Sequence, residues 1–335
     1  MILVTGGTGL VGSHLVYHLI EAGETPVVLK RSTSDISMIK RVFSYYSNDS
    51  ETLFSKIKWV DGDICDYNSV LDAMEGIDHV YHTAAKVSFH SSDKESVIST
   101  NIVGTTNIVN AAIEKNIKKL VYVSSIGALG RAIDGVVTED SHWNSKKSSI
   151  YSTSKHHAEM EVWRGIAEGL NAVIVNPSII LGPGDWKSGS SKLFTTMYKG
   201  LKFYSKGTNG FVDVNDVAKC MILLMNKDIA GDRFILNSEN ISYKNFFYWM
   251  ADALGVAPPK YEAARFLSEL GWRLLWLRGI IIGKIPTITR ETAETANQYY
   301  QYSNDKIIEN TGIKFIPVKE SIKINSAFFL QSCNN

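Results

Sequence analysis

The chain has 335 residues, and 35 Lys and Arg face 34 Asp and Glu, so its formal net charge is +1. That balance argues against a nucleic-acid-binding protein that works through a basic face, and a hydrophobic content of 44% argues against a disordered chain. The length predicts roughly two domains.

Short apolar runs alternate with amphipathic stretches over the first half of the chain. Six of the runs have the composition of buried parallel strands and lie at residues 2–5, 26–29, 57–60, 79–82, 120–124 and 172–176. Helical patterns lie between most of them, at residues 8–22, 68–74, 97–115 and 152–168. Strands that alternate with helices predict an α/β protein with a doubly wound parallel sheet, the Rossmann fold.

The pattern changes after residue 176. A helix is predicted at 214–225, a late strand at 234–237, and a helix at 243–254 with Ser242 as its N-cap. We therefore expect residues 1–176 to form a dinucleotide-binding core to which a segment at about 211–237 returns. Residues 177–210 and 238–330 then form a smaller, mostly helical substrate-binding region.

A glycine-rich loop joins the first strand to the first helix and reads Thr-Gly-Gly-Thr-Gly-Leu-Val-Gly over residues 5–12. Glycines at this spacing allow a tight turn, a close approach of backbone to pyrophosphate, and close packing of helix on sheet. The helix N-terminus adds free N–H groups and a favourable dipole. We expect phosphate contacts from Gly6, Thr8, Gly9, Leu10, Val11 and Gly12, although such a loop can also be merely structural.

The residues after the second strand indicate which dinucleotide is bound. NAD sites usually have an acidic residue there for the ribose hydroxyls. This chain has Lys30, Arg31 and Ser32 instead, and two cations suit a phosphate group. The sequence therefore favours NADP(H) over NAD(H), unless both cations simply lie in a solvated loop.

Tyr151 and Lys155 are four residues apart on a predicted helix and so share one face. A cation about 5 Å from a phenol, at an effective dielectric constant of about 20, contributes about 3 kcal/mol, which lowers the phenol pKa by roughly two units. Ser125 follows a strand, where a hydroxyl can donate to a carbonyl oxygen that gains charge. Taken alone, a serine there is more often a loop hydrogen-bonding residue.

Together, the loop at 5–12, Ser125, Tyr151 and Lys155 resemble the short-chain dehydrogenase/reductase superfamily. The length and the form of the loop are similar to its extended branch, the NAD-dependent epimerase/dehydratase family. The runs at 84–89 and 123–130 resemble the dihydroflavonol reductase and 3β-hydroxysteroid dehydrogenase members of that branch. The resemblance covers about residues 1–237.

The resemblance implies further cofactor-binding residues around the sheet edge. Asp63 and Ile64 would flank the adenine, and Asn101 would organise the site. Small residues at the fourth strand end would let the cofactor pass, and a turn after the sixth would meet the nicotinamide. The implied set is Asp63, Ile64, Thr83, Ala84, Ala85, Lys86, Asn101, Ser124, Tyr151, Lys155, Pro177, Ser178 and Ile179. Simpler explanations are equally open. They are a loop cap for Asp63, tight packing for the strand end at 83–85, and a plain buried hydrogen bond for Asn101. Asp213 and Asp216 are better explained as helix caps.

The implied function is an oxidoreductase that moves a hydride between a nicotinamide and a carbonyl or alcohol, with Tyr151 as acid/base, Ser125 steadying charge and Lys155 tuning the phenol. A nucleotide-sugar epimerase or dehydratase with tightly bound NAD is an alternative. Lys30, and Ser-Ile-Gly at 125–127 where dehydratases have Thr-Asp-Glu, count against it. A non-enzymatic dinucleotide sensor is a second alternative, but such proteins usually lack the Tyr/Lys pair.

The substrate, partners and location are less defined by the sequence. Aromatic and apolar residues hint at a small apolar substrate, although such residues are usually core: Trp186, Phe194, Met197, Tyr198, Trp272 and Trp276. Relatives can pair the 97–115 and 151–168 helices into a homodimer, and a monomer is equally open. We expect no metal site, no nucleic-acid partner and no membrane span, since the nearest candidate span, 272–285, is interrupted by cations. Trp272, Leu275, Trp276 and Gly279 form an apolar helical stripe, which favours a substrate lid or core helix and leaves a membrane-surface helix as an alternative. Three widely spaced cysteines and no signal-peptide pattern favour the cytoplasm.

Overall fold

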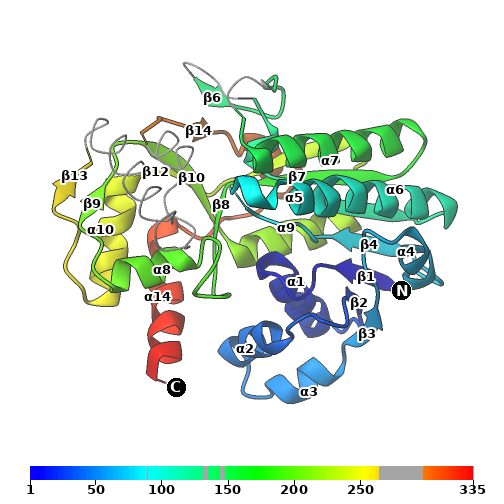
Figure 1. The fold of residues 1–335 in the computed structure, drawn as a ribbon, viewed down its shortest axis with the longest axis horizontal. Coiled ribbons are helices and arrows are strands. Elements are labelled where there is room, and N and C mark those ends of the chain that lie inside the picture. Colours follow the sequence, from blue (N-terminus) through cyan, green and yellow to red (C-terminus); the bar gives the residue numbers. More distant parts are fainter. Residues whose placement is uncertain (89, 131–134, 144–147, 264–296, 335) are drawn as a thin grey trace.

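A seven-stranded parallel sheet forms the centre of the protein (Figure 1). The computed structural model describes residues 1–88, 90–130, 135–143, 148–263 and 297–334. The strand order is β11-β7-β5-β4-β1-β2-β3. The strands are β1 (Ile2–Thr5), β2 (Val27–Lys30), β3 (Lys58–Asp61), β4 (His79–His82), β5 (Lys119–Val123), β7 (Ala172–Pro177) and β11 (Asp232–Leu236). The order reverses at β1, as in a doubly wound Rossmann sheet, so the predicted fold class is confirmed.

Helices cover both faces of this sheet, because successive strand residues point to opposite sides. Val121 and Val173 pack in one buried cluster with α1 (Leu10–Glu21), α2 (Ser37–Tyr46) and α9 (Val214–Asn226). Their neighbours Leu120 and Ile174 pack in a second cluster with α4 (Tyr67–Ala73), α6 (Gly104–Glu114) and α7 (Ile150–Ala167). The short helix α3 (Ser50–Ser55) follows α2.

Most helix boundaries differ from the sequence prediction by one or two residues, and two of the differences have a visible cause. The helix predicted at 97–115 is α5 (Lys94–Ile98) and α6 joined by a π-helical turn at Ser99–Val103. The wider turn leaves Asn101 buried, which 3.6-residue periodicity alone does not predict. Helix α7 starts at Ile150 rather than at 152, because the Ser149 hydroxyl caps it by accepting from Ser152 N at 2.7 Å.

The C-terminal part builds a smaller cluster beside the main sheet (Figure 1). It contains the sheet β12-β10-β8, with strands Glu239–Ser242, Thr208–Asp213 and Ile179–Leu181, and helices α8 (Lys192–Tyr198), α10 (Tyr243–Leu254) and α14 (Val318–Asn334). Ser242 caps α10, as predicted. Trp186, Phe194 and Met197 are buried in this cluster and Tyr198 is exposed. Trp272, Trp276 and the rest of residues 272–285, for which the sequence predicts a lid or core helix, lie outside the described residues.

Two short strand pairs, one α-helix and two 3-10 helices (Ser91–Asp93 and Ile126–Ala128) complete the described elements. Strand β9 (Phe203–Tyr204) pairs with β13 (Tyr261–Glu262), and β6 (Val136–Val137) pairs with β14 (Gln301–Tyr302). Helix α13 is Asp305–Thr311. Among the described helices, none is both long and apolar enough to cross a membrane.

The chain returns to the main sheet after residue 210. Strand β11 pairs with β7, and α9 packs against α1 on the sheet face. The Asp213 carboxylate caps α9 by accepting from Asn215 N at 2.8 Å, as predicted, and it also accepts from the Ser321 hydroxyl of α14. Asp216 accepts from Ile316 N at 2.7 Å, and burial raises its pKa to about 6. These carboxylates therefore tie the C-terminal helix to the core.

Two histidines are fully buried in the sheet layers. His82, at the end of β4, contacts the hydroxyls of Thr5 (2.7 Å) and Thr105 (3.0 Å) through its two ring nitrogens. His14 on α1 contacts Leu10 O at 2.8 Å through Nδ1. Burial lowers the pKa of each to about 3, so both are neutral in the folded protein.

This burial predicts that the protein loses stability in mild acid. In the unfolded chain each histidine titrates near 6.5, so the unfolded state gains protons as the pH falls below that value while the folded state does not. Each buried histidine then removes about 2 kcal/mol of unfolding free energy between pH 7 and pH 5. In urea unfolding, His82→Gln should reduce this pH dependence, whereas exposed His142→Gln should not. An equal pH dependence in both variants would contradict the assignment.

Candidate functional site

The glycine loop is pressed against the end of β4. Gly6 has φ of +72°, and a Cβ there would lie 2.5 Å from Ala84 N and 2.8 Å from Thr83 C. A Cβ on Gly12 would lie 2.2 Å from Gly6 O and 2.7 Å from the Thr83 hydroxyl. The Thr83 hydroxyl donates to Thr5 O at 2.7 Å and closes the contact. The loop therefore packs directly on Thr83 and Ala84, and no residue larger than glycine fits at positions 6 and 12. Sequence reasoning missed Gly7, whose Cβ would lie 2.4 Å from a methyl of Val28.

The same loop fits a bound pyrophosphate. Gly9 is exposed, and the nearest atom to its missing Cβ is Gly6 O at 3.2 Å. Gly9 is also the N-cap of α1, so no side chain occupies the first N–H groups of this helix, and its first turn carries no acidic residue. Thr8, Leu10 and Val11 are partly buried around this opening. A helix N-terminus with open N–H groups suits an anion.

The two cations after β2 have different surroundings. Lys30 lies opposite Asp61 in the sheet register, and its Nζ forms a 2.5 Å ion pair with the Asp61 carboxylate. Arg31 and Ser32 are exposed. The positive charge of Arg31 lowers the pKa of the Cys65 thiol, which burial raises, so Arg31 lies near the turn at 63–65. Arg31 is therefore better placed than Lys30 to meet an incoming phosphate.

The turn expected to flank the adenine is held by its own hydrogen bonds. The Asp63 carboxylate accepts from Cys65 N at 2.9 Å, as a loop cap does. Ile64 is buried against the start of α6, where a Cβ on Gly104 would lie 2.5 Å from its Cδ1. Asn107 donates to Ile64 O at 2.9 Å. The structure thus accounts for Asp63 and Ile64 structurally, and their role toward adenine stays a prediction.

Asn101 organises the loop that follows β4. Its Oδ1 accepts from Lys86 N at 2.7 Å, and its Nδ2 donates to Lys86 O at 3.0 Å and to the Ser154 hydroxyl at 2.9 Å. The Lys86 side chain turns away to Asp93 and Ser96. Asn101 therefore links the loop that contains Ala84 and Ala85 to helix α7, which carries Tyr151.

The structure brings Ser125 and Tyr151 together. Ser125 follows β5, and Tyr151 lies in the first turn of α7. Their hydroxyls are hydrogen-bonded, which lowers the pKa of Tyr151, but burial raises that pKa more, so the net shift is upward from 10. The Ser125 hydroxyl also accepts from Gly127 N at 3.0 Å. A phenol that holds its proton beside a hydroxyl donor can protonate a carbonyl oxygen.

Lys155 is fully buried one turn further along α7. Its Nζ donates to Val123 O at 2.7 Å and to the Tyr122 hydroxyl at 2.9 Å. Burial lowers the pKa of Lys155 to about 7, and the Glu159 carboxylate opposes this shift. The net shift of the Tyr151 pKa is upward rather than the expected lowering, because desolvation of the phenol dominates. The hydrogen bonds of Lys155 go to Tyr122 and Val123.

The remaining predicted residues line the ends of β5 and β7. The Ser124 hydroxyl donates to buried Glu159 at 2.6 Å, so its side chain is engaged within the protein. Pro177 ends β7 and Ile179 begins β8. Between them, the Ser178 hydroxyl is buried and has no hydrogen-bond partner among the described residues. The same is true of Asn176 Oδ1. A buried hydroxyl without a partner fits a polar ligand group at this turn.

Comparison with known proteins identifies related chains. Residues 2–236 match the NAD dependent epimerase/dehydratase family. A putative dihydroflavonol 4-reductase of Synechocystis is 29% identical over 331 residues, which cover 95% of this chain and 91% of that protein. Cinnamoyl-CoA reductase 1 of Petunia hybrida is 27% identical over 334 residues, 96% of this chain and 90% of that protein.

Solved structures agree on the fold. The crystal structure of gox2253 superposes with a TM-score of 0.83 at 30% identity and covers 99% of this chain and 98% of its own. The Bordetella bronchiseptica enzyme WbmH in complex with NAD+ superposes with a TM-score of 0.74 at 20% identity, over 98% of both chains. Such a neighbour shows that this fold holds a dinucleotide in another protein.

The glycine geometry predicts two different effects from one added methyl group. Gly12→Ala should disturb the loop itself and lower both the melting temperature and the affinity for the dinucleotide. Gly9→Ala should leave the melting temperature near that of the unchanged protein and weaken dinucleotide binding by about tenfold or more, a loss of about 1.4 kcal/mol. Thermal unfolding and fluorescence titration measure the two effects. Unchanged dinucleotide affinity in Gly9→Ala would contradict the predicted phosphate site.

Proposed function

We propose that this chain reduces the carbonyl of a small apolar substrate through Ser125, Tyr151 and Lys155. The premise is that the chain belongs to the NAD-dependent epimerase/dehydratase family and is an NAD(P)-dependent oxidoreductase. The observation that carries this proposal is the hydrogen-bonded Ser125–Tyr151 pair at the carboxyl edge of the sheet, with Lys155 buried behind it. The activities that name the two relatives, reduction of dihydroflavonol and of cinnamoyl-CoA, support a carbonyl substrate.

The chain's own groups divide the reaction between them. A bound nicotinamide supplies the hydride. Tyr151 donates its proton to the substrate oxygen, and the Ser125 hydroxyl donates a hydrogen bond to the same oxygen as negative charge builds there. Lys155 holds positive charge behind the phenol, which stabilises the tyrosinate left after proton transfer. In the alcohol-oxidising direction the same groups act in reverse.

The neighbouring parts of the chain support the division between cofactor and substrate regions. We assign the cofactor to residues 1–176 with the returning segment at about 211–237, and the substrate to 177–210 and 238–330. Strand β8 continues directly from the turn at Ser178, so the second region begins at the site. Trp186, Phe194 and Met197 are core residues, so an apolar substrate would contact other side chains.

NADP(H) is the proposed preferred cofactor, and exposed Arg31 is the residue that supports it most. A guanidinium near the turn at 63–65 can bind a phosphate with two parallel hydrogen bonds. Lys30 is already paired with Asp61 and contributes less.

Exposed apolar side chains support a homodimer, and free thiols support a cytoplasmic location. Ile98, Val103 and Met160 are 37%, 44% and 39% exposed on the helices expected to pair in a homodimer. The thiols of Cys65, Cys220 and Cys333 are free, which suits the reducing cytoplasm.

Tyr151→Phe tests the catalytic assignment. The ring is kept and the proton donor is lost, so dinucleotide affinity should stay within about twofold while kcat falls by about 10²–10⁴-fold. Turnover is measured as NADPH consumption against a panel of carbonyl compounds. The control is Tyr67→Phe, because the Tyr67 hydroxyl on α4 donates to Glu114 at the C-terminal end of α6. Full activity in Tyr151→Phe would overturn the assignment.

Arg31→Ala tests the cofactor preference. Loss of the guanidinium should raise the Kd for NADPH by about 10–100-fold, because a charge-assisted bidentate contact is lost, and should change the Kd for NADH little. Lys30→Ala is the matched control and should have the smaller effect. A clear preference of the unchanged protein for NADH would refute the proposal.

A further inference from the structure

Glu159 is a fully buried carboxylate that no step of the proposed reaction uses. It lies on α7, one turn beyond Lys155, and none of its surface is exposed. Its Oε2 accepts from the Ser124 hydroxyl at 2.6 Å and from Asn176 Nδ2 at 2.8 Å. Its Oε1 accepts from Arg233 at 2.8 Å and from the Trp163 indole at 3.3 Å. Four donors from four segments of the chain therefore meet on one carboxylate.

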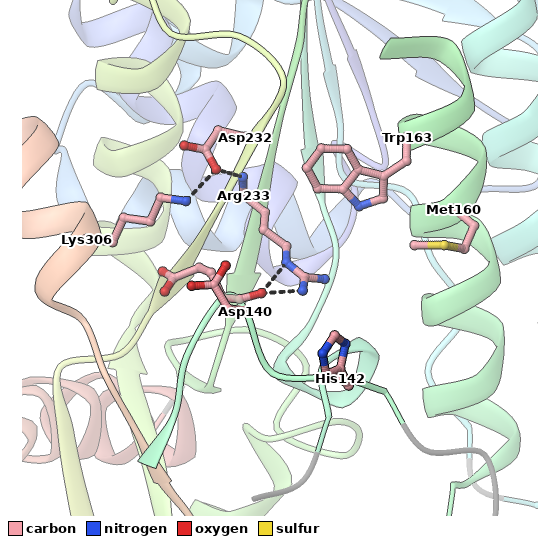
Figure 2. A pocket seen from close by; sticks show the side chains of 8 residues that line it. Asp140, His142, Met160, Trp163, Asp232, Arg233 and Lys306 are labelled. Atoms are coloured by element: carbon pink, nitrogen blue, oxygen red, sulfur yellow. Dashed lines mark hydrogen bonds and ion pairs between the residues drawn. The ribbon is translucent and has the colours of Figure 1, made fainter. Parts of the chain in front are cut away.

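Arg233 balances the charge of Glu159 from the edge of the sheet. It lies on β11, and its side chain is 19% exposed. Its guanidinium also donates to Glu139 O, with 2.8 Å for the Nε contact. This arginine lines an open pocket of about 580 Å³, in which Figure 2 shows Trp163 and Met160 of α7 on one side and Asp232 with Lys306 on the other. The ion pair thus runs from that pocket to the interior beneath the site.

The Glu159 contacts fix the strand ends that carry the site. Asn176 Nδ2 bridges Glu159 and the carbonyl oxygen of Ser125, at 2.8 Å and 3.0 Å. The amide is therefore held with its nitrogen toward β5, and the ends of β5 and β7 are joined at Ser125. The Ser124 hydroxyl adds a second link from the same strand end to the same carboxylate. Without Glu159, the Ser124 hydroxyl and one of the two N–H groups of Asn176 would lose their acceptor inside the protein, which is unfavourable.

Glu159 also acts on Lys155 through its charge. The groups that face Lys155 are Tyr122 of β5 and His82 of β4, and Glu159 on its own helix. His82 is neutral, and burial raises the pKa of Tyr122 far above 10, so neither supplies a negative charge. The Glu159 carboxylate opposes the burial that lowers the Lys155 pKa to about 7. It therefore helps Lys155 stay protonated.

We propose that the buried Glu159–Arg233 pair is a positioning device for the catalytic residues, in which Glu159 orients Ser125 through Ser124 and Asn176 and keeps Lys155 charged. The ion pair with Arg233 offsets the free-energy cost of burying the Glu159 carboxylate, because an unpaired charge at this depth would be strongly destabilising. The proposal rests on the proposed function, since it assigns a purpose to these contacts only if Ser125 and Lys155 act on a substrate.

Two variants separate positioning from simple stability. Glu159→Gln removes the charge and leaves Arg233 unpaired, so both stability and kcat should fall. The double variant Glu159→Gln with Arg233→Gln removes both buried charges, and such neutral replacements regain stability. If the pair positions the site, the double variant regains its melting temperature while kcat stays at least about tenfold low, with dinucleotide Kd within about twofold. Should Glu159→Gln not fold, the double variant carries the test alone.

The pH profile gives a readout that a structural role would not move. Without the Glu159 carboxylate the pKa of Lys155 falls, so Lys155 loses its proton at a lower pH. The alkaline limb of kcat should therefore move to lower pH in the double variant.

Lys119→Met is the control for loss of a buried charge elsewhere on β5. Lys119 lies at the opposite end of that strand, and its Nζ donates to Leu224 O at 2.7 Å. This variant should lose stability and keep both kcat and its pH profile. If the double variant behaves like Lys119→Met, with kcat and pH profile unchanged, positioning is refuted. Carbonyl reduction that survives Tyr151→Phe refutes the proposed function instead, so the two failures are distinguishable.

Discussion

The glycine loop packs against the end of β4 without room for a Cβ, and the rest of the site depends on this packing. Because all strands of the sheet run parallel, their carboxyl ends meet along one edge. At that edge Gly6 and Gly12 touch Thr83 and Ala84 at distances that exclude any Cβ. This contact sets where α1 begins and leaves its first N–H groups open. The shape of the edge at which we expect the dinucleotide to bind is therefore set by how closely the glycine loop packs on the end of β4.

Burial of charge is the second constraint on the site. Tyr151, Lys155 and Glu159 lie on successive turns of α7, and Lys155 and Glu159 are almost completely inaccessible to solvent. In such surroundings each ionised group is costly unless another compensates it. Desolvation therefore favours the protonated phenol and the neutral amine, while Glu159 favours the ammonium and Arg233 favours the carboxylate. Changing one charge in this row changes the protonation of the next.

The sequence predicts the fold well, and it predicts a site at one edge of the sheet, because both predictions depend on local patterns. Buried strands, the glycine loop and the Tyr151–Lys155 spacing are each visible within a few residues. What it did not predict depends on contacts between distant residues. Lys30 pairs with Asp61 across two strands, and Lys155 hydrogen-bonds to Tyr122 while burial raises the pKa of Tyr151. Glu159 could have been noticed, since it lies four residues after Lys155 on the same helical face, but its partners Ser124, Asn176 and Arg233 come from three strands or strand ends.

The most direct test of the account is the fate of the transferred hydrogen. NADPH that carries deuterium at the transferable position of the nicotinamide is incubated with the protein and a carbonyl panel, and the products are analysed by mass spectrometry. A reductase places one deuterium on the new carbinol carbon for each cofactor oxidised. Net cofactor consumption of zero, with isomerised substrate as the only product, would contradict a reductase and favour an epimerase that keeps its dinucleotide.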